Sequence, residues 1–190
     1  MQPPQTTAVL GAGTMGNGIA HVCARSGFSV LLCDLQQSFL DRAHASIEKN
    51  LAREVSKNKL TQQQAAEALS RITLTTDREA LSSCALAIEA ATEKFEIKSA
   101  LFRDLDRILP VEAILASNTS SISITKLAAQ TSRPAQVIGM HFFNPVPVMP
   151  LVEVIRGLQT SQQTFDTVKT LAEALGKTPI EVNDAAGFVS

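Results

Sequence analysis

The 190-residue sequence has no excess of charge of either sign, because 17 lysine and arginine residues stand against 18 aspartate and glutamate residues, a formal net charge of −1. Positive and negative side chains are mixed along the chain, and no basic cluster suited to a nucleic-acid backbone occurs. Residues 1–24 have no charged side chain. Glycine, threonine and asparagine interrupt their apolar runs, and no basic segment precedes them, unlike a signal peptide. The sequence therefore indicates neither a nucleic-acid partner nor a signal peptide.

Membrane-spanning and metal-binding patterns are also missing. Residues 134–152 are uncharged but contain four prolines, which excludes a membrane-spanning helix. The three cysteines, at 23, 33 and 84, have unrelated spacings and form no C-x-x-C motif, and the three histidines, at 21, 44 and 141, are scattered. This pattern favours reduced, buried thiols in an intracellular protein without a metal site. We expect a cytoplasmic location, with an organellar matrix as the alternative.

The N-terminal segment combines a short apolar strand, a glycine-rich loop and an amphipathic helix. The loop is Gly11-Ala12-Gly13-Thr14-Met15-Gly16, a G-x-G-x-x-G motif. In a nucleotide-binding βαβ unit, the three glycines make the tight turn, let a pyrophosphate approach the backbone and let the helix pack closely. The next strand ends in Asp34, where a ribose-binding carboxylate is expected, and residues 35–38 contain no arginine for a 2′-phosphate. The sequence predicts NAD rather than NADP; the alternative is a glycine turn without a ligand.

Strands and helices alternate along the chain. We expect strands at 7–11, 29–34, 72–75, 85–90, 113–117, 137–142, 151–156 and 178–183, and helices at 14–26, 38–56, 61–70, 94–109, up to 130, and 162–175. The capping boxes Ser38-x-x-Asp41 and Thr61-x-x-Gln64 predict the starts of the second and third helices. The alternation predicts an α/β fold of the Rossmann type, a doubly wound, mostly parallel sheet with a helical-hairpin insertion.

A histidine and a glutamate lie on two apolar segments near the C-terminus. His141 closes the strand at 137–142, and Glu153 lies in the middle of Leu-Val-Glu-Val-Ile; prolines at 145, 147 and 150 separate them. A carboxylate buried in such a segment is costly unless it is paired, and His141 is the nearest plausible partner. A buried pair of this kind orients a general base. The alternative is that His141 ends a strand and Glu153 faces water on an edge strand.

Two further polar segments follow strands of the predicted sheet. Glu93 follows the strand at 85–90, where it either contacts a cofactor or complements the dipole of the next helix. Ser117–Ser121 follows the strand at 113–117. At least one of its hydroxyl groups is expected to cap the next helix. Because five polar residues exceed the needs of one cap, we favour a polar wall that faces the reaction site.

Four motifs, in this order and spacing, resemble the 3-hydroxyacyl-CoA dehydrogenase family: Gly-Ala-Gly-Thr-Met-Gly, Ser-Asn-Thr-Ser-Ser, His-Phe-Phe-Asn-Pro-Val-Pro-Val-Met and Leu-Val-Glu-Val-Ile. The resemblance covers the whole chain, and the His-Phe-Phe-Asn-Pro block is its most specific part. It implies NAD bound to a Rossmann domain. It also implies the reversible oxidation of (S)-3-hydroxyacyl-CoA to 3-oxoacyl-CoA in fatty-acid metabolism, on short-chain substrates such as 3-hydroxybutyryl-CoA.

The resemblance further implies roles for single residues. His141 would be the base that takes the proton of the 3-hydroxyl group, and Glu153 would orient it. Ser120 would bind the reacting oxygen of the substrate beside the cofactor, and Asn144 would help to place nicotinamide and substrate. The glycine loop from Gly11 to Gly16 and Asp34 would hold the rest of the cofactor.

Four other positions match the family less directly. Glu93 and Lys98 match positions near the cofactor ribose and nicotinamide. Asn50 and Lys57 lie on the helical hairpin, where the family receives coenzyme A, although the match there is loose.

Members of the family continue into an all-helical domain that closes over the substrate and forms a homodimer. We therefore expect residues 1–184 to be the NAD-binding domain and 185–190 to begin a linker to an all-helical domain that this chain lacks; alone, the chain should be nearly inactive. The alternatives are a related sugar-acid (gulonate-type) dehydrogenase, a non-catalytic NAD-binding module, and a multifunctional β-oxidation protein with an enoyl-CoA hydratase. Against the last, the glycine loop at residue 11 leaves no room for a preceding domain in this chain.

Overall fold

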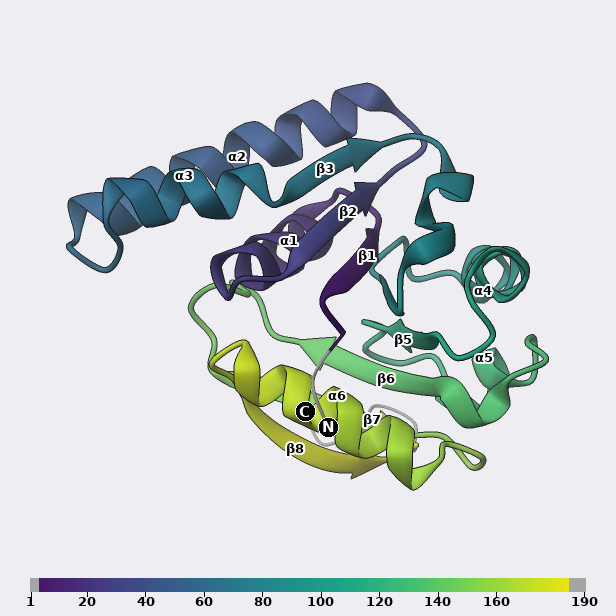
Figure 1. The fold of residues 1–190 in the computed structure, drawn as a ribbon. Coiled ribbons are helices and arrows are strands. Elements are labelled where there is room, and N and C mark those ends of the chain that lie inside the picture. Colours follow the sequence, from purple (N-terminus) through teal and green to yellow (C-terminus); the bar gives the residue numbers. More distant parts are fainter. Residues whose placement is uncertain (1–3, 185–190) are drawn as a thin grey trace.

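The computed structural model describes residues 4–184, in which one eight-stranded sheet lies between two layers of helices (Figure 1). The strands are β1 (Thr6–Leu10), β2 (Ser29–Cys33), β3 (Ile72–Thr75), β4 (Leu86–Glu89), β5 (Ile114–Ser117), β6 (Val137–Phe142), β7 (Leu151–Arg156) and β8 (Thr178–Asn183). Their order in the sheet is β3-β2-β1-β4-β5-β6-β7-β8. Every neighbouring pair is parallel except β6 and β7, which are antiparallel. The predicted mostly parallel α/β fold is confirmed.

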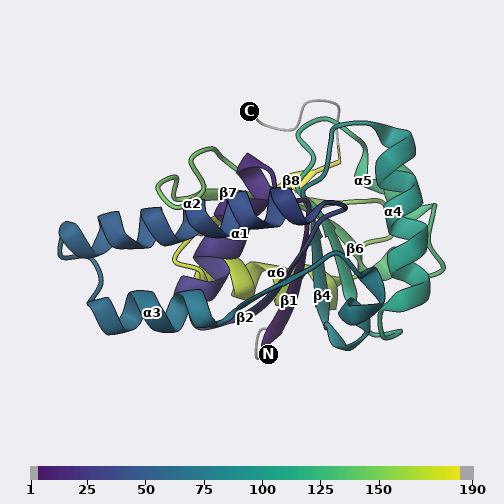
Figure 2. The same cartoon turned by 90° about the horizontal axis from the view of Figure 1, so that it is seen from above.

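The helices cover both faces of this sheet (Figure 2). They are α1 (Thr14–Arg25), α2 (Gln37–Ser56), α3 (Gln62–Ser70), α4 (Phe95–Ile108), α5 (Ile124–Ala128) and α6 (Gln162–Ala174), with short 3₁₀ helices η1 (Arg78–Ser83) and η2 (Pro134–Gln136). Successive strand residues point to opposite faces, so Val9 packs in the core under α1, α2, α3 and α6, whereas Leu10 packs in the core under α4 and α5. Helices on both faces make the sheet doubly wound.

One of the two predicted capping boxes exists. Thr61 and Gln64 cap α3 reciprocally: the Gln64 amide donates to the Thr61 hydroxyl at 3.1 Å, and the Thr61 amide donates to the Gln64 side chain at 2.8 Å. The box predicted at Ser38 and Asp41 is wrong. Helix α2 begins at Gln37, so Ser38 already lies in its first turn, and Asp41 accepts a hydrogen bond from the Gln37 side chain at 2.8 Å.

The sheet reverses its winding between β1 and β4. The chain leaves β1 into α1 on one face and leaves β4 into α4 on the other, although the two strands are neighbours. In doubly wound sheets, ligands bind in the crevice beyond the carboxyl ends of the strands at such a point. The residues that follow β1, β4, β5 and β6 therefore lie along one edge of the sheet.

Candidate functional site

The glycine loop follows β1 at this edge. Gly11 has a φ of +99°, and a Cβ on it would lie 2.7 Å from the Ala90 carbonyl oxygen; a Cβ on Gly16 would lie 1.7 Å from the Gly11 carbonyl oxygen. A Cβ on Gly13 would meet no atom within 4 Å. Packing therefore requires the first and third glycines, whereas the second faces open space. Helix α1 begins there without a side-chain cap, so its first amide groups are available to a phosphate.

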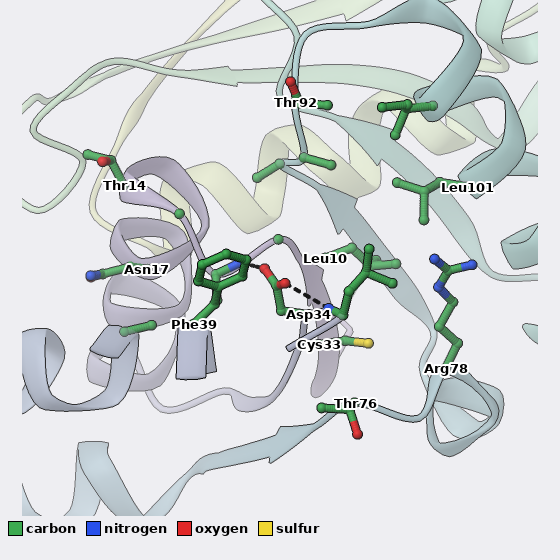
Figure 3. Close-up of a pocket in the computed structure, with 18 of the residues that line it drawn as sticks. Leu10, Thr14, Asn17, Cys33, Asp34, Phe39, Thr76, Arg78, Thr92 and Leu101 are labelled. Carbon is green, nitrogen blue, oxygen red and sulfur yellow. Dashed lines mark hydrogen bonds between the residues drawn. The ribbon is translucent and has the colours of Figure 1, made fainter. Parts of the chain in front are cut away.

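A cavity of about 890 Å³ lies beside this loop (Figure 3). Ligand cavities are commonly about 300–1,000 Å³, so it is large enough for a cofactor. The residues that line it come from the end of β1 and the glycine loop, the end of β2, the first turns of α2, the segments after β3 and β4, and α4. They include Gly11, Ala12, Gly13, Thr14, Asp34, Phe39, Arg42, Arg78, Thr92 and Leu101.

Asp34 joins the end of β2 to the glycine loop. One carboxylate oxygen accepts a hydrogen bond from the Ala12 amide at 2.6 Å, and the other accepts one from the Leu35 amide at 2.7 Å. A carboxylate oxygen can accept two hydrogen bonds, so both oxygens retain acceptor capacity at the wall of the cavity. The role of Asp34 in binding ribose hydroxyl groups stays a prediction, which this free acceptor capacity supports.

His141 and Glu153 lie directly opposite each other on β6 and β7. Nδ1 of His141 lies 2.7 Å from a Glu153 carboxylate oxygen, and their side chains are 12% and 3% exposed. Strand β8 pairs with the other side of β7, so Glu153 is not on an edge strand and the alternative of a solvated carboxylate is wrong. A neutral imidazole that donates from Nδ1 has an acceptor at Nε2. The arrangement is suited to moving a proton.

Neighbouring side chains hold the end of β6 in place. The Phe143 ring centroid lies 4.8 Å from that of His141. The Asn118 side chain, which follows β5, accepts a hydrogen bond from the Phe142 amide at 2.8 Å. Asn144, three residues after His141, is exposed. The polar segment after β5 thus fixes the strand end that carries the histidine.

Glu93 binds this same polar segment. Its carboxylate accepts hydrogen bonds from the Thr119 hydroxyl, from the Ser120 amide at 3.0 Å and from the Ser121 hydroxyl at 3.2 Å. Burial raises the pKa of Glu93, but the hydrogen bonds from Thr119 and Ser120 and the Lys98 ammonium outweigh it and lower the pKa below its usual value. Glu93 lies outside the lining of the cavity and orients the loop that carries Ser120.

Lys98 points into the protein. It is 1% exposed, and its ammonium lies 2.7 and 2.9 Å from the two carboxylate oxygens of Glu89 and 3.3 Å from Glu93. Glu89 is fully buried and also accepts from the Ser117 hydroxyl at 2.6 Å and the Ala91 amide at 2.7 Å. The sequence analysis missed Glu89. An acidic residue at the end of the apolar strand Leu-Ala-Ile-Glu was the available signal.

The predicted helix cap lies elsewhere. Ser123, not a residue of Ser117–Ser121, is the N-cap of α5 and accepts from the Lys126 amide at 3.3 Å. Within the run, Thr119 accepts from the Ser121 amide at 3.3 Å and the Ile122 amide at 2.9 Å. The segment therefore folds on its own hydroxyl groups, and the Ser120 side chain remains exposed.

Asn50 and Lys57 lie far along the helical hairpin. Helix α2 reaches the cavity at Phe39, Arg42 and Ala43. At 1.5 Å per residue, Asn50 lies roughly 10 Å and Lys57 roughly 20 Å farther along the helix axis. Lys57 begins the turn to α3, at the end of the hairpin that points away from the sheet (Figures 1 and 2). The structure does not bring either residue to the cavity.

Residues 4–184 contain no candidate membrane span and no candidate metal-binding cluster. No helix in this range is long and apolar enough to cross a membrane. No group of three or more histidine, cysteine, aspartate or glutamate side chains in the same range is arranged to hold a metal ion. The three cysteines are unpaired and buried, and burial raises the pKa of the Cys33 thiol to about 11.

The glycine loop, the open space at Gly13 and the carboxylate of Asp34 define a dinucleotide-binding domain of the Rossmann type. The chain belongs to the 3-hydroxyacyl-CoA dehydrogenase family: residues 6–185 match the family model of the 3-hydroxyacyl-CoA dehydrogenase NAD-binding domain. The predicted family and the predicted cofactor, NAD, are confirmed. The predicted linker at 185–190 lies outside the described residues.

Similar proteins include a 3-hydroxybutyryl-CoA dehydrogenase and a subunit of a fatty acid oxidation complex. The probable 3-hydroxybutyryl-CoA dehydrogenase of Deinococcus radiodurans is 55% identical over 183 residues, which are 96% of this chain and 65% of that protein. The fatty acid oxidation complex subunit alpha of Acinetobacter baylyi is 44% identical over 187 residues, 98% of this chain and 26% of that protein.

Solved structures agree with this assignment. The crystal structure of (S)-3-hydroxybutyryl-CoA dehydrogenase from Ralstonia eutropha matches with a TM-score of 0.97 and 49% identity, over 98% of this chain and 66% of that one. The chain thus spans about 65% of the length of its 3-hydroxybutyryl-CoA dehydrogenase relatives.

Proposed function

We propose that this chain provides the NAD-binding and proton-transfer part of an enzyme that reversibly oxidises (S)-3-hydroxyacyl-CoA to 3-oxoacyl-CoA, with a short-chain substrate such as 3-hydroxybutyryl-CoA. The observation that carries the proposal is the 2.7 Å contact between His141 and buried Glu153. His141 lies near the end of β6, at the same edge of the sheet as the glycine loop. The names of the similar proteins support the acyl-CoA class of substrate over a sugar acid.

Each residue has a chemical task in this proposal. NAD, when bound, accepts the hydride from the carbinol carbon. His141 takes the hydroxyl proton at Nε2, and its Nδ1–H donates to Glu153, whose charge stabilises the imidazolium as it forms. The Ser120 hydroxyl hydrogen-bonds the reacting oxygen, and the Asn144 amide helps to position the substrate.

The cofactor is held by backbone more than by side chains. The amide groups at the start of α1 bind the pyrophosphate, with Gly13 leaving the necessary space, and Asp34 accepts from the ribose hydroxyl groups. Glu93 and Lys98 act through the loop of Ser120, which they hold against β4.

The oligomeric state, the substrate-binding domain and the compartment are properties of the complete protein. We propose that it is a homodimer with an all-helical domain following a linker that begins at 185–190, and that Asn50 and Lys57 face coenzyme A. Three buried thiols favour a reducing compartment, the cytoplasm. The similarity to fatty acid oxidation subunits leaves a multifunctional parent as the alternative context.

Turnover by the complete protein tests the proposal. NADH oxidation is followed by absorbance with acetoacetyl-CoA, and NAD reduction is followed with gulonate. We expect rapid turnover of acetoacetyl-CoA, none of gulonate, and a loss of about 10²–10⁴-fold in His141→Ala. Preferred turnover of gulonate would support the sugar-acid alternative. NADH binding without turnover of either compound would support a non-catalytic module.

A further inference from the structure

We infer that Arg42 is a latent binding site for a 2′-phosphate, and that the negative charge of Asp34 is what makes this site select NAD over NADP. The inference rests on the proposal that this cavity binds NAD. It goes beyond that proposal because it names the residue that would bind the 2′-phosphate of NADP.

Arg42 is held at the wall of the cofactor cavity. It lies one turn after Phe39 on α2, and both side chains line the cavity. The guanidinium carbon lies 4.7 Å from the centroid of the Phe39 ring, and Nε donates to the Ser38 carbonyl at 3.1 Å. A guanidinium has five N–H donors, so these contacts orient Arg42 and leave four N–H groups for a ligand.

The charge of Arg42 is not neutralised by the protein. Among residues 4–184, no carboxylate forms an ion pair with Arg42. The other arginine of the cavity, Arg78, pairs with Asp104. The cavity also contains two carboxylates, Glu96 on the first turn of α4 and Asp34 at the end of β2. Arg42 is therefore the arginine in this cavity that remains available to an anion.

Asp34 and Arg42 act oppositely on a 2′-phosphate. The ribose hydroxyl groups of a dinucleotide bind at Asp34, and Phe39 and Asp34 project into the same cavity (Figure 3). A phosphate on the 2′-oxygen would lie against the Asp34 carboxylate, which repels it, in a cavity that Arg42 also lines. Arginine binds phosphate with charge-assisted, often bidentate hydrogen bonds. Without the charge of Asp34, the attraction of Arg42 would dominate.

A double-mutant cycle on the 190-residue chain tests this inference. The variants are Asp34→Asn, Arg42→Gln and the double variant, with Kd for NADH and NADPH measured by fluorescence titration. We expect the wild type to prefer NADH, and Asp34→Asn to gain at least about tenfold in NADPH affinity relative to NADH. Adding Arg42→Gln to Asp34→Asn should lower the affinity for NADPH about tenfold and change the affinity for NADH by less than about threefold.

Two controls keep the test decisive. Arg53→Gln removes the same charge from an exposed position farther along α2 and should leave both affinities unchanged. In Asp34→Asn an NH2 group replaces one of the two oxygens that accept from Ala12 and Leu35. If this weakens the binding of both cofactors, Asp34→Ser is used in its place. Equal loss of NADH and NADPH on Arg42→Gln, or no loss of NADPH, would overturn the inference. Failure of the wild type to bind NADH would instead refute the assignment of the cavity.

Discussion

Gly18 on α1 lies against Val146 in the loop that follows Asn144, so closely that a Cβ on Gly18 would be 2.7 Å from the Cβ of Val146. The helix that begins at the glycine loop is thus in direct contact with the loop beyond His141. Lys177, directly before β8, donates to the carbonyl groups of Val146 and Met149 and also holds this loop. A glycine outside the nucleotide motif therefore sets the spacing between cofactor and catalytic segments.

Gly18→Ala should destabilise the chain. Alanine favours a helix over glycine by roughly 1 kcal/mol, but overpacking typically costs about 1–3 kcal/mol. Val146 is buried, and the contact is with its Cβ, which side-chain rotation cannot move away. We expect a lower midpoint of thermal unfolding, and a double variant with Val146→Ala that loses less than the sum of the two single variants. A raised midpoint would show that Val146 moves freely.

Glu89→Gln should be among the costliest single substitutions in the fold. It leaves the buried Lys98 ammonium without its main counter-charge, and breaking a buried pair typically costs about 3–5 kcal/mol. Urea denaturation measures the loss. Glu89→Gln combined with Lys98→Met should cost less than the two single losses added together. Glu79→Gln, in an exposed pair with Arg107, should cost less than about 1 kcal/mol, and a similar cost for Glu89→Gln would contradict the burial argument.

His21 should make the fold sensitive to mild acid. Burial lowers the pKa of His21 from 6.5 to about 4, with Arg25 and Lys177 also lowering it and Glu54, 3.2 Å away, opposing them. Between these values the unfolded chain binds a proton and the native chain does not. The contribution of neutral His21 to stability is therefore fully present above pH 6.5. The free energy of unfolding falls as the pH drops towards 4, by up to about 3 kcal/mol.

Urea denaturation between pH 4 and 7.5 measures this slope. His21→Gln should flatten the dependence of stability on pH in this range. Glu93, Asp106 and Asp184 have pKa values below their usual range, so the stability that is lost on their protonation is lost in both proteins. Identical slopes for wild type and His21→Gln would show that this histidine does not govern the pH dependence.

The fold followed from local patterns because each pattern has a direct steric cause. Gly11 and Gly16 are required by backbone contacts within a few residues or across one strand, and the alternation of apolar segments fixes the layers. The partnership of His141 with Glu153 was also accessible, since adjacent strands separated by a short proline-rich loop are the expected neighbours.

What escaped prediction depends on contacts between distant segments. The start of α5 is held by Asp184, whose carboxylate accepts from the Ile124 amide at 2.9 Å, the Thr125 amide at 2.8 Å and the Ser123 hydroxyl at 2.8 Å. A local sequence pattern does not predict a hydrogen-bond partner some 60 residues away. The inward direction of Lys98 likewise depends on Glu89, on another element.

Arg42 shows a different kind of omission. A phosphate-binding arginine is expected directly after the strand, and residues 35–38 contain none. Helical periodicity puts Phe39, Arg42 and Ala43 on one face of α2, and that face lines the cavity. The arginine lies four residues beyond the segment in which it is expected.

The central claim is that His141 and Glu153 work as one unit, and a double-mutant cycle in the complete protein tests it most directly. Turnover of acetoacetyl-CoA and the Kd for NADH are measured for His141→Ala, Glu153→Gln and the double variant. Each single variant should lose about 10²–10⁴-fold in kcat with NADH affinity nearly unchanged, and the double variant should lose little more than His141→Ala alone. A double variant that lost the product of the two single effects would show that the residues act independently, and the account would fail.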